Sequence, residues 1–262
     1  MIKIEGRAAV LGELWFDEPV PEKPGVDILA VHQRPAPVEG RDCTLFLTLV
    51  NDLTAAEDDL FAAYGENNRY KINRARNRDA LEFRLVADPG AELDAFCGFY
   101  DAFAAQKGLP GAYRKGLRAA CDAGRLALTS ATREGEVLVW HAYMTDGRSA
   151  SLQHTASHFR GVDKSDRAVI ARANRWHHWR DMLAFKALGY ERFCWGGMFE
   201  DESAPERANI NNFKREFGGR LERNYNCTFP VTLRGRAAMA ALRVVTALER
   251  FRARRALRPA AA

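Results

Sequence analysis

Long apolar segments are absent from this 262-residue sequence. No stretch approaches the roughly 18 residues that a membrane-crossing helix needs, and Glu5, Glu13 and Asp17 interrupt the N-terminal segment before a signal-peptide core can form. Internal repeats and low-complexity segments are absent too, and 47% hydrophobic with 28% charged residues is typical of a folded chain. We therefore expect a folded, cytoplasmic protein without an integral membrane segment.

Cysteine is scarce and shows no pairing pattern. The five cysteines are odd in number, widely spaced and free of any CxxC pair: Cys43, Cys97, Cys121, Cys194 and Cys227. This usage indicates neither a disulfide framework nor a zinc site, and we expect no bound metal. A free cysteine in an apolar stretch such as residues 193–195 is usually a small buried side chain rather than a nucleophile.

Positive charge is concentrated in two places. The net charge is +5, but after Thr232 there are eight arginines against Glu249 alone, so this tail carries +7 and residues 1–231 sum to −2. A second basic run without any acid comprises Arg69, Lys71, Arg74, Arg76 and Arg78. Such clusters favour a polyanionic partner, namely phosphate groups, RNA or an anionic membrane. The alternative is that long cationic side chains simply cover solvated helix faces.

Hydrophobic periodicity and turn residues predict a mixed order of elements. Half of the ten prolines fall in the first forty residues, which favours short or edge strands there. The following segments read, in order, as strand 81–86, helices 91–106 and 113–123, an antiparallel meander of strands 126–132, 137–145 and 149–156, a long helix capped by Ser165 and ended by Gly189, strand 192–197, helix 208–217 and strand 221–229.

This order is typical of the α/β (α+β) fold of GNAT-type N-acyltransferases, in which helices flank a mixed, mostly antiparallel central sheet. We divide the chain into an N-terminal extension over residues 1–80, a GNAT-like acyltransferase domain over residues 81–231 and an Arg-rich C-terminal helix over residues 232–262. In that helix the residues Ala238, Leu242, Val245, Leu248 and Phe251 form a thin apolar stripe. We expect it to pack on the domain, with contact to an anionic membrane as the alternative.

Three segments carry a more specific resemblance: 69–78 (RYKINRARNR), 186–197 (KALGYERFCWGG) and 212–219 (NFKREFGG). In this order and spacing the chain resembles the FemAB-like (FemXAB) acyltransferases, GNAT-related enzymes that build peptidoglycan cross-bridges, over about residues 44–229. The resemblance implies that Lys214 lies in the channel of the acyl donor and stabilises negative charge during transfer, as an ammonium group can in a water-poor site. Gly218 and Gly219 would let the backbone approach a ligand closely. The alternative is a surface lysine on a short helix, with Phe213 and Phe217 as core anchors.

The sequence also departs from the relatives. The residues before Leu81 are too few for the second GNAT-like half of typical cross-bridge enzymes, so dependence on transfer RNA does not follow from the resemblance. Acetyl-CoA enzymes carry a Gln/Arg-x-x-Gly-x-Gly/Ala loop before the long helix, and residues 158–165 here contain one glycine. The candidates for holding the donor's phosphates at that helix N-terminus are Arg160, Gly161, Lys164 and Arg167. The candidates for binding substrate are Arg69, Lys71, Arg74, Trp195 and Phe213.

Acyl transfer to an amine needs a group that takes up the ammonium proton. His154 on the predicted third meander strand is the first candidate, and Glu200 and Asp201 after the Gly196–Gly197 strand end come next. The alternative for His154 is a hydrogen-bonded structural histidine. His177 and His178 are adjacent on a helix and point apart, which argues against a shared metal. No Gly-x-Ser-x-Gly elbow surrounds Ser151, which argues against a hydrolytic triad.

The leading hypothesis is therefore an acyltransferase that moves an acyl or aminoacyl group from acyl-CoA or aminoacyl-tRNA to an amine on a cell-envelope, polysaccharide or nucleotide-sugar precursor. No permanently bound cofactor and no DNA partner are expected. Transfer RNA, a small-molecule or envelope-precursor acceptor and peripheral contact with the inner membrane face through the C-terminal helix are the expected partners. The competing hypothesis is a catalytically inactive GNAT-fold module that binds RNA or an anionic membrane through its basic regions.

Overall fold

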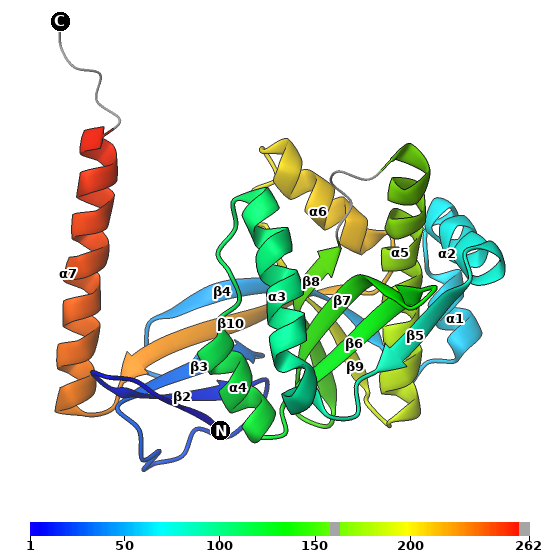
Figure 1. Ribbon diagram of the computed structural model, residues 1–262. Coiled ribbons are helices and arrows are strands. Elements are labelled where there is room, and N and C mark those ends of the chain that lie inside the picture. The colour runs from blue at the N-terminus through cyan, green and yellow to red at the C-terminus, as the bar shows by residue number, and fades with distance from the viewer. Residues whose placement is uncertain (158–162, 257–262) are drawn as a thin grey trace, which may run out of the picture. The chain divides into compact units, whose positions relative to one another are not determined.

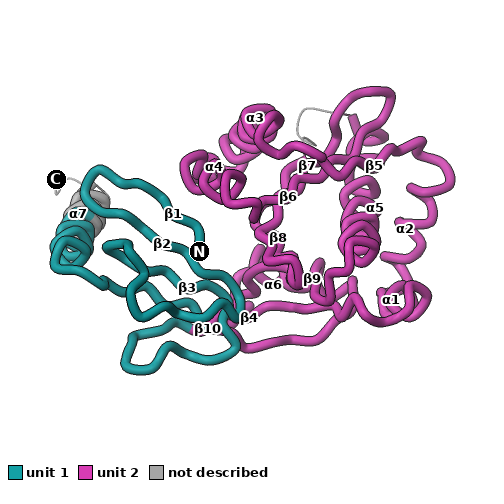
Figure 2. The backbone as a smooth tube through the Cα atoms, turned by 90° about the horizontal axis from the view of Figure 1, so that it is seen from below, with its two compact units in different colours: residues 1–44, 225–262 teal, residues 45–224 magenta. Residues whose placement is uncertain are grey.

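The computed structural model describes residues 1–157 and 163–256, with side chains through residue 245. The chain forms two compact units, one of residues 1–44 with 225–262 and one of residues 45–224 (Figure 2). The division into residues 1–80, 81–231 and 232–262 stays a prediction.

The larger unit is built on a mixed sheet. Its strands lie in the spatial order β4 (Cys43–Asp52), β9 (Arg192–Met198), β8 (Ser149–Ser157), β7 (Glu136–Thr145), β6 (Leu126–Arg133) and β5 (Leu81–Leu85) (Figure 1). All these neighbours are antiparallel except β8 and β9, which run parallel. The predicted meander over β6, β7 and β8 is confirmed, and with it the mixed, mostly antiparallel sheet of the GNAT-type fold.

Helices cover the two faces of this sheet, as the alternation of side chains along β7 shows. Trp140 contacts Phe96 of α3 (Pro89–Lys107), whereas the next residue, His141, contacts His177 of α5 (Lys164–Ala187). Because successive strand residues point to opposite faces, α3 and α5 lie on opposite sides of the sheet. Helix α4 (Arg114–Asp122) packs beside α3, and α2 (Glu66–Arg78) packs against α5 after the short α1 (Glu57–Ala62).

The long helix α5 departs from the prediction in two details. Its N-cap is Asp163, whose carboxylate accepts a hydrogen bond from the Asp166 backbone N–H at 2.8 Å, and not Ser165. The helix also ends earlier than Gly189, at Ala187, which is exposed, while Ala173 and Trp176 are buried. The buried face also contains polar side chains, which an analysis of apolar spacing does not count: His177, His178 and Asp181.

The smaller unit holds β1 (Ile2–Glu5), β2 (Val10–Trp15), β3 (Ile28–Arg34) and β10 (Arg220–Pro230). Strands β2 and β3 are parallel, and the β1–β2 and β3–β10 pairs are antiparallel. A small apolar core that includes Leu14, Leu29, Val31 and Phe229 supports this sheet.

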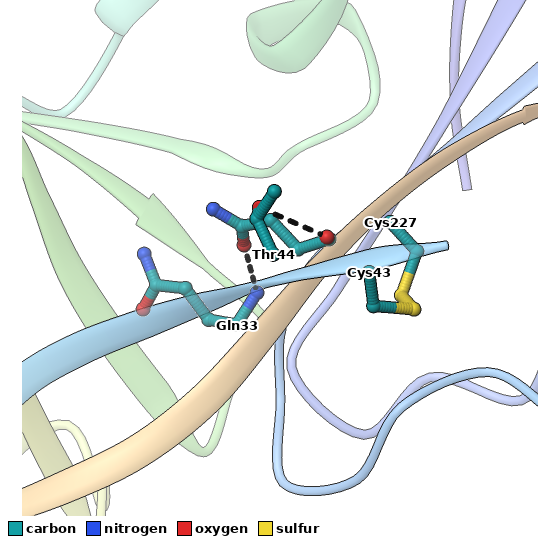
Figure 3. The surroundings of a disulfide bond; sticks show 5 residues. Gln33, Cys43, Thr44 and Cys227 are labelled. Carbon is teal, nitrogen blue, oxygen red and sulfur yellow. Dashed lines mark hydrogen bonds between the residues drawn. A yellow bond between two sulfur atoms is a disulfide. The ribbon is translucent and has the colours of Figure 1, made fainter. Parts of the chain in front are cut away.

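A disulfide joins Cys43 to Cys227 across this smaller unit (Figure 3). Beside it, Thr44 donates a hydrogen bond to the carbonyl of Asn226 at 3.3 Å. The expectation that no cysteines pair is therefore wrong for Cys43 and Cys227, and cysteine usage does not indicate a reducing compartment. The prediction for Cys194 is confirmed: the side chain is buried, and burial raises the pKa of its thiol to about 12.

The C-terminal helix α7 (Leu233–Ala256) is mostly exposed over its described side chains. Leu242 is 65% and Val245 49% exposed, so these two residues do not pack within their own unit, and packing of the stripe on the larger unit stays a prediction. Among residues 1–157 and 163–256, no helix is both long and apolar enough to cross a membrane.

Candidate active site

The parallel β8–β9 ladder ends within the sheet. The two strands pair from Ser149 with Arg192 to Ser151 with Cys194, while β8 continues to Ser157 and β9 to Met198. Both strands are also irregular there, because the β7–β8 register shifts at Gln153 and the β4–β9 register shifts between Cys194 and Gly197. Such bulges are frequent next to active sites, where they redirect side chains.

A pocket of about 540 Å³ opens at this point. Its lining comes from β8, β9, α3, α5 and the helix α6 (Pro205–Arg215), and includes Tyr100, Phe103, Lys107, Leu152, Gln153, His154, Thr155, Asn174, His178, Trp195, Gly196, Gly197, Asn209, Ile210, Phe213 and Lys214. The structure thus brings together four of the residues that the sequence singled out: Lys214, His154, Phe213 and Trp195.

Gly196 is the residue that lets β9 run close to β8 at the pocket wall. Its φ is +68°, a backbone conformation that favours glycine, and a Cβ there would lie 2.6 Å from the Leu152 carbonyl oxygen. By contrast, Gly218 and Gly219 approach the protein's own backbone, since a Cβ would lie 2.9 Å from the Ala63 and 2.7 Å from the Val50 carbonyl oxygen. The expectation that these two glycines make room for a ligand is therefore wrong.

Lys214 lies near the C-terminal end of α6, half-buried in the pocket wall. Its Nζ donates to the Gly197 carbonyl oxygen at 2.6 Å, and burial lowers the pKa of the ammonium group to about 8. The preceding loop is held by buried Asn211, whose amide binds the Phe199 backbone N–H at 3.1 Å and carbonyl at 2.8 Å. Lys214 is therefore positioned at the end of β9 with its charge still present at neutral pH.

Aromatic packing fixes the helix that carries Lys214. Phe213 and Phe217 have ring centroids 5.3 Å apart, and Phe217 lies 4.4 Å from the Trp195 ring. The Trp195 indole N–H donates to Asn51 on β4 at 2.7 Å, and the Arg175 guanidinium lies 4.8 Å over Phe213. Phe213 and Trp195 thus anchor the core and line the pocket at the same time.

His154 enters the pocket from the α3 side of the sheet. Its ring lies 4.5 Å from that of Tyr100 and 6.1 Å from that of Phe96, both on α3. Burial lowers the pKa of this imidazole below its ordinary value, so it is neutral at pH 7. A neutral imidazole can take up a proton, which is what the predicted base must do.

The charge of the lining is one-sided. Its cationic side chains are Lys107 and Lys214, its histidines His154 and His178 have lowered pKa values, and no aspartate or glutamate occurs among the lining residues that the structure describes. Such a lining favours a ligand that carries or develops negative charge. It also leaves only a histidine or a neutral lysine to take a proton from a bound amine.

Other predicted site residues lie away from this pocket. Glu200 is exposed after the end of β9 and is not part of the lining. Arg69 donates to the Ala62 carbonyl at 2.9 Å and to the Tyr64 carbonyl, so it caps the C-terminal end of α1. Lys71 and Arg74, on α2, are also outside the lining, and Arg74 donates to the Tyr70 hydroxyl at 3.4 Å.

The predicted phosphate site at the start of α5 is described only in part, because Arg160 and Gly161 lie outside the described residues. Lys164 and Arg167 are exposed and do not line the pocket. The Asp163 carboxylate holds the Asp166 N–H and accepts from the Ser165 hydroxyl at 2.9 Å. A carboxylate therefore occupies the position at which an anion would bind this helix N-terminus.

Sequence reasoning missed a buried cluster behind the pocket. His141 Nδ1 lies 2.6 Å from Asp181 Oδ2, which also accepts from the Tyr143 hydroxyl at 2.6 Å, and His141 Nε2 lies 3.0 Å from the Asn174 side-chain oxygen. Oxygen atoms thus face both ring nitrogens of His141. The Asp181 and Asn174 side chains thus hold the His141 ring from both of its nitrogen atoms.

His177 and His178 stack on His141 with centroid distances of 3.9 and 4.1 Å and interplanar angles of 9° and 18°. Two rings cannot occupy one face at that distance, so they lie on opposite faces. The adjacent His177 and His178 side chains thus lie apart, as predicted, with the His141 ring between them. The His-His-x-x-Asp spacing on α5 was the available signal, because it places Asp181 one turn from both histidines.

The ligand atoms of His141, His177 and Asp181 lie within 4.8 Å of one another. However, imidazole lone pairs lie in the ring plane, and the His141 and His177 rings are nearly parallel. Their lone pairs therefore do not converge on one ion, and Asp181 is bonded directly to His141. The arrangement is that of a hydrogen-bonded cluster rather than a metal centre.

The fold and the open β8–β9 ladder are similar to the GNAT-type fold of FemXAB-like proteins. Among solved structures, FemX matches with a TM-score of 0.57 at 12% identity over 69% of this chain and 61% of its own. A C-terminal domain assigned to a lysylphosphatidylglycerol synthetase from Agrobacterium fabrum matches with a TM-score of 0.56 at 16% identity, over 91% of this chain and 83% of that domain.

L-PGS from Bacillus licheniformis matches with a TM-score of 0.50 at 15% identity, over 79% of this chain and 68% of its own. No family model matches the sequence, and no curated protein does. At these identities the likeness concerns the fold, and this chain spans less than two thirds of FemX. The fold expected from the three sequence segments is thereby confirmed.

Proposed function

We propose that the protein is an acyltransferase that moves an acyl or aminoacyl group from an activated donor to an amine on a cell-envelope or polysaccharide precursor. The observation that carries this proposal is the position of Lys214. Its ammonium group, with a pKa of about 8, lies half-buried in the pocket where the β8–β9 ladder ends. The similarity in fold to FemX and to a domain assigned to a lysylphosphatidylglycerol synthetase supports an acceptor from the envelope.

The chemistry follows from the lining. The acceptor ammonium gives one proton to neutral His154, and the amine nitrogen then forms a bond to the acyl carbon. The carbonyl electron pair moves to oxygen, where Lys214 stabilises the negative charge. When the carbonyl re-forms, the bond to the leaving group breaks, the leaving group takes the second nitrogen proton, and His154 releases its proton to water. No covalent enzyme intermediate is needed.

Acyl-CoA and aminoacyl-tRNA both remain as donors in this proposal. The one-sided positive lining favours the negatively charged groups that either donor carries. The open pocket supports an enzyme over the inactive binding module, for which a filled groove would be expected. The basic segment on α2 does not contribute to the lining, so we do not assign it to the acyl donor.

A mass-spectrometric screen tests the proposal. Acyl-CoAs and charged transfer RNAs are incubated with amino-sugar nucleotides and with phosphatidylglycerol vesicles, using the wild type and a Lys214→Met variant. We expect an acylated product that depends on Lys214. If no combination gives a Lys214-dependent product, the proposal is rejected, and a product on a hydroxyl group of phosphatidylglycerol alone would reject the amine as acceptor.

A further inference from the structure

His178 is a fully buried polar side chain in the pocket wall, and its Nδ1 lies 4.0 Å from Asp181 Oδ2, beyond hydrogen-bond distance. It is 0% exposed, and neither of its ring nitrogens has a hydrogen-bond partner among residues 1–157 and 163–245. Buried polar groups in native proteins are almost always hydrogen-bonded, so an exception beside a pocket points to a group that binds there. The adjacent His177 is equally buried but bonds the Thr129 hydroxyl at 2.9 Å and does not line the pocket.

The surroundings of His178 fix the ring in place. One side of it meets the His141 ring at 4.1 Å, and the aromatic rings of Trp195, Phe213 and Phe217 lie at 4.7, 5.9 and 5.5 Å. A ring held on several sides cannot swing away to find another partner. The His178 ring is therefore held in place in the pocket wall, and a group that stabilises a transition state has to be preorganised in this way.

Charged and titratable groups from each packed element decide its protonation state. These are His141 on β7, Arg175, His177 and Asp181 on α5, and Lys214 on α6. Burial comes first in lowering the pKa of His178 well below its ordinary value, and the charges of His141, Arg175 and Lys214 act in the same direction. The ring is therefore neutral, with one N–H to donate, while Lys214 carries the positive charge of the same pocket.

We propose that His178 donates a hydrogen bond to the carbonyl oxygen of the transferred acyl group, so that it shares with Lys214 the negative charge that develops on that oxygen. This assignment rests on the proposed acyltransferase function and makes His178 a catalytic residue of that site. No proton passes to or from His178 in the step. The amine proton goes to His154 as described above, and the hydrogen bond strengthens as the carbonyl becomes an oxyanion.

Amide variants separate this role from the role of a base. His178→Gln and His178→Asn each keep an N–H donor, near the position of Nε2 and Nδ1 respectively, but cannot take up a proton. His178→Leu removes the donor while remaining compatible with its aromatic neighbours. His177→Leu is the matched control, because it removes the other ring stacked on His141 without changing the pocket lining.

The expected result is a fall in kcat of about 10²- to 10³-fold for His178→Leu, the effect of losing one oxyanion donor. KM for the acyl donor should change little, one of the two amide variants should recover most of the activity, and His177→Leu should keep kcat within a few-fold of the wild type.

Three outcomes overturn the assignment. If His178→Leu turns over as fast as the wild type, His178 is not a catalytic residue. If both amide variants are as slow as His178→Leu while the wild type is active, the loss of an N–H donor is not the cause. If the wild type gives no Lys214-dependent product at all, the proposed function fails, and the role of His178 with it. The first two outcomes leave the proposed function intact.

Discussion

Replacing Asp181 with asparagine should destabilise the larger unit strongly. The Asp181 side chain is 0% exposed, and its Oδ2 binds both His141 Nδ1 and the Tyr143 hydroxyl at 2.6 Å. Burial raises the pKa of Asp181, but the neighbouring histidines and the two hydrogen bonds outweigh burial and hold it below the ordinary value. The variant removes the carboxylate from these two buried hydrogen bonds, and a hydrogen bond to a charged group contributes about 1.5–3 kcal/mol to the free energy of unfolding.

Chemical denaturation followed by tryptophan fluorescence measures this loss, because Trp140, Trp176, Trp179 and Trp195 all lie in residues 45–224. Asp201→Asn is the matched control. Asp201 is 62% exposed and pairs with Arg207 at 3.0 Å, so its replacement should leave the denaturation midpoint nearly unchanged. If Asp181→Asn also left the denaturation midpoint nearly unchanged, the two buried hydrogen bonds to Asp181 would not stabilise the larger unit.

Two further predictions concern pH and membranes. Burial holds the pKa of both His177 and His178 well below 6.5, so the unfolded chain binds more protons than the folded chain below about pH 6.5. The free energy of unfolding should therefore fall with decreasing pH in this range, by about 1.4 kcal/mol per pH unit for each histidine. If His177→Leu did not reduce this dependence of the free energy of unfolding on pH, the prediction would be contradicted. We also predict that α7 binds anionic vesicles, since Leu242, Val244 and Val245 are exposed beside Arg243. Replacing Arg236 and Arg243 with glutamine should weaken binding to the vesicles by about 2 kcal/mol, which is roughly a thirtyfold loss of affinity in a co-sedimentation assay. Equal recovery of the wild type and this variant with the vesicles would refute the contact.

The sequence predicts the elements of the larger unit well because their signals are local. Alternation marks β6, β7 and β8, and helical spacing marks α3 and α5, within two or three residues of their observed ends. The disulfide leaves no such signal, because Cys43 and Cys227 are 184 residues apart and only the β-pairing of the smaller unit brings them together.

The residues of the candidate site also differ in whether local sequence signals predict them. Lys214, Phe213 and Trp195 belong to contiguous segments that resemble a known family, and they are found in one pocket. His141 was not found, because its place opposite α5 depends on the face that the β7 register gives it. An analysis of periodicity identifies buried faces by their apolar residues. It therefore does not predict that the polar residues His177, His178 and Asp181 are buried.

The central claim is that Lys214 stabilises an oxyanion in the pocket where the β8–β9 ladder ends. Single-turnover formation of the acylated product by the wild type, Lys214→Met and Lys115→Met tests it most directly, because Lys115 is an exposed lysine outside the lining. We predict a fall of about 10²- to 10³-fold for Lys214→Met, with its fold unchanged by circular dichroism, and no change for Lys115→Met. Equal rates for all three proteins would contradict the account.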